Sequence, residues 1–98
     1  MPVTQWLIEN GYEDVVIFEN PSYEAAFIGV THDNRAVYAY EKMVQNLMEE
    51  DGMSEEDAIE FIDYNTIRSL GYQPMAPIIV YCVETISKEE QNDANDIA

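Results

Sequence analysis

The chain has 98 residues, the length of one domain, and 47% of them are hydrophobic, which is enough to build a buried core. Twenty Asp and Glu residues stand against four Lys and Arg, so the formal net charge is −16. This balance excludes the basic footprint of a nucleic-acid-binding protein and disfavours attachment to anionic lipid headgroups. A partner attracted by long-range electrostatics is therefore expected to be cationic, such as a basic protein surface.

The first half of the chain is predicted to contain a helix over residues 4–10, a buried strand over 15–18 (VVIF), and two further strands over 25–31 and 35–40. Thr4 is the expected N-cap of the helix. The run VVIF is β-branched and aromatic throughout, which is typical of a covered strand. Asp33 and Asn34 tolerate the positive φ of a tight turn, so the second and third strands are predicted to form a hairpin.

The second half is predicted to contain helices over 40–51 and 54–70, a strand over 77–83 and an acidic, disordered tail over 84–98. The last strand is apolar on both faces, so we expect it to be central or covered. The order α-β-β-β-α-α-β predicts a small two-layer α+β domain over residues 1–83, with a mostly antiparallel sheet and helices on one face.

Cys82, in the apolar run PIIVYCVE, is the only cysteine and is expected to be a buried free thiol. No apolar segment approaches the ~20 residues of a membrane span, and the N-terminus MPVTQWLIENG lacks the features of a signal peptide. These observations predict a cytoplasmic protein.

Motifs that would indicate catalysis or metal binding are absent from the sequence. An EF-hand with Gly52 at loop position six would have Leu47 at position one and Ala58 at position twelve, and neither is a calcium ligand. His32 is predicted at a hairpin tip and Cys82 in a strand, so a Cys–His nucleophile is not expected. The sequence contains no GxSxG, GxGxxG, P-loop or CxxC motif. We therefore expect no enzyme, no catalytic residue, no cofactor and no metal.

Two polar residues of the long helix are expected to have structural roles. Thr66 lies at the centre of the apolar stripe, where its hydroxyl can bond the carbonyl one turn back. Arg68, one of only four basic residues, is expected to neutralise nearby carboxylates or to cap the last carbonyls of the helix.

The run MEEDGMSEEDAIEFID, residues 48–63, holds eight carboxylates and no basic residue. Part of it follows helix-end chemistry: Gly52 ends one helix, Ser54 caps the next, and Met53 can pack on Ala58 as a hydrophobic staple. Carboxylates in the first turn, such as Asp57, are favoured by the helix dipole by ~0.3–1 kcal/mol each.

The other carboxylates are not explained in this way. Glu49, Glu50 and Asp51 end a helix, where the dipole disfavours anions, and Glu60 and Asp63 have no basic residue at i+4. Either they serve general solubility or they mimic a polyanion. The five charges from Glu55 to Asp63 span about 12 Å at 1.5 Å per residue, or roughly one per 2.4 Å, the same order as the 1.7 Å of duplex DNA.

We therefore predict a partner-binding surface made of Glu49, Glu50, Asp51, Glu56, Asp57, Glu60, Asp63 and Tyr64. Tyr64 is included because an aromatic ring beside carboxylates suits an arginine-rich surface. The expected partner is a basic, nucleic-acid-binding surface of a larger protein, with no direct binding of nucleic acid or membrane. The alternative is a regulatory or housekeeping module that binds through the apolar and aromatic sheet face carrying Tyr38 and Tyr40.

The segments HDNRAVYAYEKMV, LMEEDGMSEEDAIEFIDYNTIRSLGY and APIIVY resemble a group of small acidic, uncharacterised proteins of Gram-positive bacteria and their phages or mobile elements. The resemblance covers residues 26–81 and implies a bacterial or phage origin, but it brings no activity and no catalytic residue. Small acidic phage proteins also include anti-restriction and anti-CRISPR inhibitors that mimic nucleic acid. That analogy rests on charge and size alone.

Overall fold

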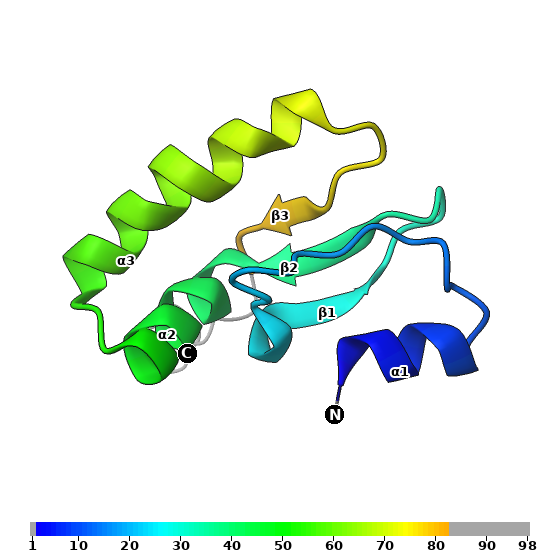
Figure 1. Ribbon diagram of the computed structural model, residues 1–98, viewed down its shortest axis with the longest axis horizontal. Helices are drawn as coiled ribbons and strands as arrows, with labels where there is room; N and C mark the ends of the chain where they lie inside the picture. The colour runs from blue at the N-terminus through cyan, green and yellow to red at the C-terminus, as the bar shows by residue number, and fades with distance from the viewer. Residues whose placement is uncertain (1, 83–98) are drawn as a thin grey trace, which may run out of the picture.

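The computed structural model describes residues 2–82 of the chain. Its elements are α1 (Val3–Glu9), the 3-10 turn η1 (Glu24–Ala26), β1 (Phe27–Val30), β2 (Ala36–Ala39), α2 (Tyr40–Asp51), α3 (Glu55–Phe61), the π-helical η2 (Ile62–Ile67), the 3-10 turn η3 (Leu70–Tyr72) and β3 (Ile78–Val80). The molecule measures 47 × 30 × 26 Å. Along its long axis, α1 lies at one end and the turn between α2 and α3 at the other (Figure 1). The predicted α+β class is confirmed.

The sheet has the order β1-β2-β3, with β1 and β2 antiparallel and β2 and β3 parallel. One of our expectations was wrong here, because the sheet is mixed rather than mostly antiparallel. The last strand, expected to be central or covered, lies at an edge beside the central β2, and its three residues are partly buried. A long connection through α2 and α3 joins β2 to β3, and such a connection permits parallel pairing.

The β1–β2 hairpin forms where the sequence predicts it. Asn34 adopts φ 64°, and the Thr31 hydroxyl accepts a hydrogen bond of 2.9 Å from the Arg35 backbone N–H. Arg35 Nε donates to the carbonyl oxygen of Ala76 at 2.9 Å, which ties the hairpin to the segment that leads into β3.

The strand predicted over residues 15–18 does not form. This segment has no ladder partner, and the Phe18 backbone N–H donates to the Tyr38 hydroxyl oxygen at 3.3 Å. Its apolar side chains, Val15, Ile17 and Phe18, pack against the core instead. The run VVIF is thus apolar because it covers the core as an extended segment (Figure 1). Periodicity alone does not distinguish such a segment from a buried strand.

The core lies between the sheet, the extended segment and the pair α2–α3. Its largest fully buried side chains are Tyr23, Tyr38, Met43, Leu47 and Ile62. Phe27, Tyr38 and Ile79 are register partners across the three strands and face this core. α1 joins the same side of the sheet, since Trp6 makes an edge-to-face contact with Phe27 at 5.7 Å between ring centres. Val3 and Leu7 of α1 are buried, and Pro2 rather than Thr4 is the N-cap residue.

The turn between α2 and α3 has the predicted punctuation. Gly52 ends α2 with φ 70°, and the Ser54 hydroxyl accepts a hydrogen bond of 3.1 Å from the Asp57 backbone N–H. Ala58 is buried in the core, and Met53 packs against the same cluster. The capping residues at the two helix ends, together with the packing of Met53, therefore stabilise the turn.

The predicted helix over 54–70 forms, but its centre is π-helical from Ile62 to Ile67. Thr66 is buried there, as expected, yet its hydroxyl does not bond a helix carbonyl. Its oxygen lies 2.6 Å from the Tyr23 hydroxyl, and either group can be the donor. For Arg68, the structure shows a contact that the sequence did not predict: its guanidinium lies over the Tyr64 ring, 5.2 Å from the ring centre. Among residues 2–82 it makes no hydrogen bond or ion pair with a carboxylate or a helix carbonyl.

Beyond β3, Cys82 is partly exposed rather than buried in a strand, and its backbone N–H donates to Glu41 Oε1 at 3.1 Å. The predicted tail over 84–98 lies outside the described residues. Within residues 2–82, no helix has both the length and the apolar character required to cross a bilayer.

Candidate partner-binding surface

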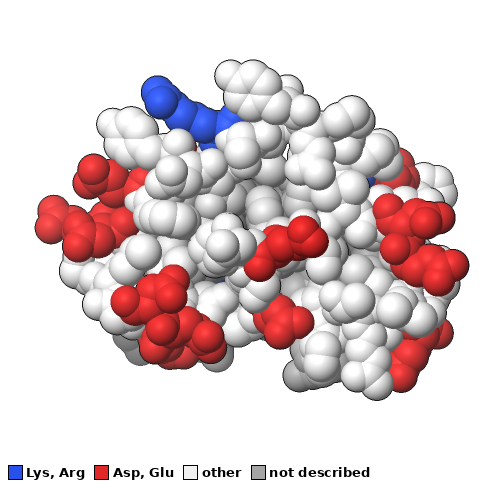
Figure 2. Space-filling view, viewed as in Figure 1, with Lys and Arg blue, Asp and Glu red and all other residues white. Residues whose placement is uncertain are grey.

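All eight residues of the predicted surface are exposed in the structure. They lie on the second half of α2, on α3 and on η2, at the end of the molecule remote from α1 (Figure 1). Figure 2 shows Asp and Glu side chains at both ends and near the centre of one face, with only a few Lys or Arg side chains on it. Five of the eight residues line two hollows, and the other three lie apart from both.

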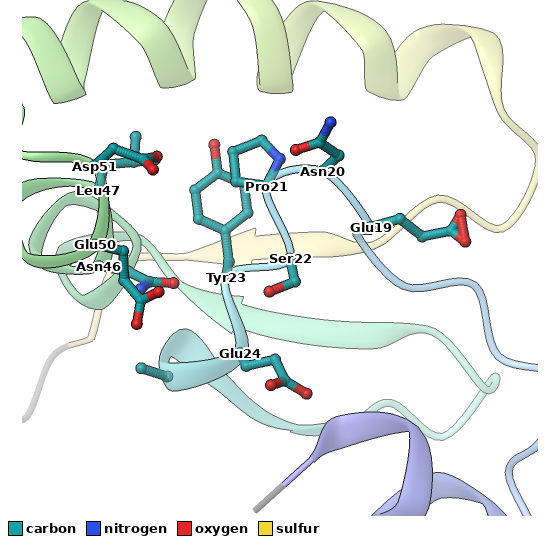
Figure 3. A pocket seen from close by; sticks show the side chains of 11 residues that line it. Glu19, Asn20, Pro21, Ser22, Tyr23, Glu24, Asn46, Leu47, Glu50 and Asp51 are labelled. Atoms are coloured by element: carbon teal, nitrogen blue, oxygen red, sulfur yellow. The ribbon is translucent and has the colours of Figure 1, made fainter.

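The first place is a hollow of about 520 Å³, which we call the corner hollow. It lies between α2 and the segment that precedes β1, and its lining is Glu19, Asn20, Pro21, Ser22, Tyr23, Glu24, Ala25, Asn46, Leu47, Glu50 and Asp51. Of the predicted residues it contains Glu50 and Asp51, which face residues 19–25 across the hollow (Figure 3). The fold thus brings two carboxylates that helix chemistry does not explain into the lining of one hollow with Glu19 and Glu24, 26 or more residues earlier in the chain.

Tyr23 forms part of the wall of the corner hollow, with a positive φ of 51° and its ring pointing toward α3 (Figure 3). Burial is the main reason that the pKa of its phenol is raised, and the negative charge of Asp51 adds to the increase. The bond to Thr66 acts in the opposite direction. Tyr23 is therefore a neutral, rigid wall of the hollow and supplies no charge to a ligand.

The corner hollow is lined by carboxylates, which are the ligands of many cation sites. Their arrangement, however, is not that of a cation site. Glu24 is already engaged, because its Oε1 accepts a hydrogen bond of 2.7 Å from the Val3 backbone N–H at the start of α1. Among residues 2–82, no group of three or more Asp, Glu, His or Cys side chains is arranged to hold a metal ion. Its two α2 carboxylates are better placed to meet the basic side chains of a partner.

The second place is an open hollow of about 440 Å³ on the outer side of α3, which we call the α3 hollow. It is lined by Met53, Asp57, Glu60, Phe61, Tyr64 and Asn65. Three of the predicted residues, Asp57, Glu60 and Tyr64, therefore lie together. Helical spacing explains this, because positions 57, 60, 61 and 64 share one face of a helix.

The floor and rim of the α3 hollow have different characters. Met53 and Phe61 are partly buried and extend the core to its floor, whereas the Tyr64 ring stands 59% exposed at its edge. The amide of Asn65 is tied back to the helix, with Nδ2 donating to the Phe61 carbonyl oxygen at 3.2 Å. The hollow thus combines an apolar base, two carboxylates and an aromatic ring, a mixture that suits a long basic side chain.

The remaining predicted residues lie apart from both hollows. Glu49 accepts a hydrogen bond of 2.9 Å from the Gln45 side chain one turn earlier, and Glu56 is exposed near the start of α3. Asp63 lies on another flank, where its charge contributes to the raised pKa of Tyr40, after burial, which is the larger cause. The eight residues are therefore not one continuous row, and the even spacing of charges along α3 is divided between two flanks.

The sequence did not indicate which residues from elsewhere in the chain line the two hollows together with the predicted ones. Glu19 and Glu24 lie outside the acidic run, and only the fold brings them to α2. Met53 was expected only as a hydrophobic staple, and Phe61 was not predicted to line a hollow. Phe61 is an apolar residue on the flank of the helix stripe, and that position is the signal that could have identified it.

The alternative binding surface, the sheet face that carries Tyr38 and Tyr40, is less exposed in the structure than the prediction requires. Tyr38 is fully buried, and its ring packs against Phe18 at 4.7 Å between ring centres. Tyr40 is partly exposed, with its ring 4.8 Å from that of Tyr81. A sheet face that includes Tyr38 is therefore core and is not available to a partner.

His32 and Cys82 lie toward opposite ends of the sheet. His32 is exposed in the turn that precedes β2, whereas Cys82 follows β3. The parallel register pairs the last residue of β2, Ala39, with Val80, so Cys82 lies beyond the end of β2 that is remote from the turn. The fold does not assemble the two side chains into a nucleophile and base.

Comparison with known proteins finds no family model, curated protein or solved structure that matches this chain. The case for a function therefore rests on the geometry of the two hollows and on the charge of the molecule.

Proposed function

We propose that this protein is a non-enzymatic, acidic binding module that occupies a basic surface of a larger protein, in the way that a phage-type inhibitor of a nucleic-acid-binding enzyme would. The observation that carries the proposal is the exposure, at one end of the molecule, of carboxylates that form no ion pair with the other residues that the structure describes. Glu50 and Asp51 line the corner hollow, and Asp57 and Glu60 line the α3 hollow.

The net charge of −16 supports a cationic partner. A protein of this charge attracts basic surfaces over distances comparable to the Debye length, about 10 Å at 0.1 M ionic strength. A groove that binds nucleic acid offers such a surface. Occupation of that groove would exclude nucleic acid by competition, which is how an anti-restriction or anti-CRISPR protein of this type would act.

The positions of the carboxylates also support binding over solubility alone. Solubility is served by acidic residues anywhere on the surface. Glu50 and Asp51 lie in the last turn of α2, where the helix dipole disfavours anions, and no basic residue is present in that turn. A binding surface accounts for acidic side chains in a place where they reduce stability.

The first experiment is capture of partners from bacterial lysate at 50 mM and 500 mM salt, followed by mass spectrometry. We expect a basic, nucleic-acid-binding protein that is captured at low salt and lost at high salt, because exposed charges are screened. Addition of duplex or single-stranded DNA should release it if the two ligands share one surface. A partner retained equally at both salt concentrations would contradict the proposal.

The second experiment assigns the surface with three double variants of equal charge change. Glu50→Gln/Asp51→Asn neutralises the corner hollow, and Asp57→Asn/Glu60→Gln neutralises the α3 hollow. Glu13→Gln/Asp14→Asn is the matched control, since these exposed residues follow α1 at the far end of the molecule. We expect the first two variants to bind more weakly than the control. An equal loss of affinity in all three variants would show that net charge alone determines binding.

A further inference from the structure

We infer that the α3 hollow is an arginine-binding site, in which Tyr64 stacks on the guanidinium of an arginine from a protein partner while Asp57 and Glu60 bind its charge. This inference rests on the proposed function and deepens it, because it names the side chain that the surface selects. The occupant is a segment of a partner protein that is rich in arginine.

The first observation is the shape and composition of the hollow. An apolar floor of Met53 and Phe61 can receive the aliphatic stem of a long side chain, because such stems pack along apolar surface while the charged head stays near water. Asp57 and Glu60 line the same hollow and carry the opposite charge to that head. The site therefore complements a basic side chain in both its apolar and its charged parts.

The second observation is independent of the carboxylates. The guanidinium of Arg68 already lies over the Tyr64 ring, with Cζ 5.2 Å from the ring centre. The Tyr64 ring thus accepts a guanidinium at cation–π distance. Arg68 is itself exposed and lies outside the lining of the hollow, so an arginine of the partner that enters the hollow can take its place on the ring.

Arginine is favoured over lysine for two reasons. Its planar guanidinium stacks on an aromatic face and is more weakly hydrated than an ammonium group. It can also donate two parallel hydrogen bonds to one carboxylate, and lysine presents a single charged point. A site that offers a ring and two carboxylates therefore discriminates between the two, whereas diffuse electrostatic attraction does not.

The test measures binding of two nine-residue peptides, one alternating Arg with Ala and the other Lys with Ala, at 50 mM salt by isothermal titration calorimetry. We expect the wild-type protein to bind the arginine peptide about two- to five-fold more tightly, the range of one exposed cation–π contact. Tyr64→Phe keeps the ring and should keep this preference. Tyr64→Leu keeps an apolar side chain without the ring and should lose it. Far-UV circular dichroism checks that these exposed substitutions leave the fold intact.

Arg68 supplies the matched comparison. Arg68→Gln and Lys42→Gln each remove one positive charge, but only the first frees the Tyr64 ring, because Lys42 is exposed on α2 away from the hollow. Arg68→Gln should strengthen arginine-peptide binding more than Lys42→Gln does, and it should leave lysine-peptide binding equal in the two variants. In the wild-type protein, the Arg68 Nε–H resonance should shift when the arginine peptide is added.

The outcomes separate this inference from the proposed function. Equal affinity of the wild-type protein for the two peptides, or an unchanged preference in Tyr64→Leu, overturns the arginine site. The proposed function is overturned separately if neither Asp57→Asn/Glu60→Gln nor Glu50→Gln/Asp51→Asn weakens the binding of the two peptides more than the Glu13→Gln/Asp14→Asn control does. Loss of binding in the neutralised variant with no effect at Tyr64 would leave an acidic surface without selection for arginine.

Discussion

The hydrogen bond between Tyr23 and Thr66 connects the wall of the corner hollow to the π-helical segment of the long helix. Tyr23 is 1% exposed and Thr66 is 6% exposed, and their hydroxyl oxygens lie 2.6 Å apart. Both groups are shielded from water, so removing one hydroxyl deprives the other of its partner. Thr66→Val is the sharpest perturbation, because it keeps a β-branched side chain of similar size and removes only the hydroxyl.

We expect Thr66→Val to cost ~1–3 kcal/mol of the free energy of unfolding, the penalty for a buried hydroxyl left without a partner. Tyr23→Phe should cost less, ~0.5–1.5 kcal/mol, since the Thr66 hydroxyl can turn to the carbonyl oxygen one turn back. In the double variant both sites are apolar, so its cost should be less than the sum of the single costs by ~1 kcal/mol.

Urea unfolding followed by the fluorescence of Trp6 measures these differences, and thermal unfolding should show a fall in Tm of roughly 4–8 °C per kcal/mol for a domain of this size. Additive costs in the double variant would contradict the reasoning, as would a Thr66→Val protein as stable as wild type. In the latter case, water from the hollow of about 110 Å³ that Thr66 lines would be satisfying the Tyr23 hydroxyl.

Three further predictions concern the helix ends and the buried phenols. Ser54→Ala should cost ~1 kcal/mol in urea unfolding through loss of the cap on the Asp57 N–H, and an unchanged midpoint would refute it. Burial raises the pKa values of Tyr23 and Tyr38, so the stability from their neutral forms is complete below pH ~10 and is lost as the pH rises through the raised values. Phenolate absorbance should then rise together with unfolding, and ionisation of all tyrosines before unfolding would contradict this. Glu50→Lys and Asp51→Lys should each stabilise the protein by ~0.3–1 kcal/mol in thermal unfolding while weakening partner capture, and a fall in Tm would refute the dipole argument.

Local chemistry was enough to predict the hairpin turn and the turn between α2 and α3, although not the start of α1, where Pro2 rather than Thr4 is the N-cap residue. Gly52, Ser54 and the Asp33–Asn34 turn act through bonds within a few residues of themselves, so their residue types carry the information. The same holds for the helices, whose apolar stripes repeat at the helical period. The class of the fold followed from these elements.

Long-range pairing was not predictable from the residues. The run VVIF has the composition of a buried strand, but whether it joins the sheet depends on which strand has a free edge beside it. Thr66 is a similar case: its burial follows from the helix stripe, whereas its bond to Tyr23 depends on a loop 43 residues earlier in the chain. The two hollows share this property, because each needs the packing of helix and core to bring its lining together.

The carboxylates of α2 and α3 fall into two groups, those whose position stabilises its helix and those whose position does not. Asp57 donates its backbone N–H to the Ser54 cap and lies where the helix dipole favours a negative charge, so its presence needs no partner. Glu50 and Asp51 lie where the dipole opposes them, and they line a hollow rather than an isolated patch of surface. A lysine at either place that raises Tm and abolishes capture of the basic partner would show that folding and binding make opposite demands on these positions. A lysine that raises Tm and leaves capture unchanged would assign them to solubility alone.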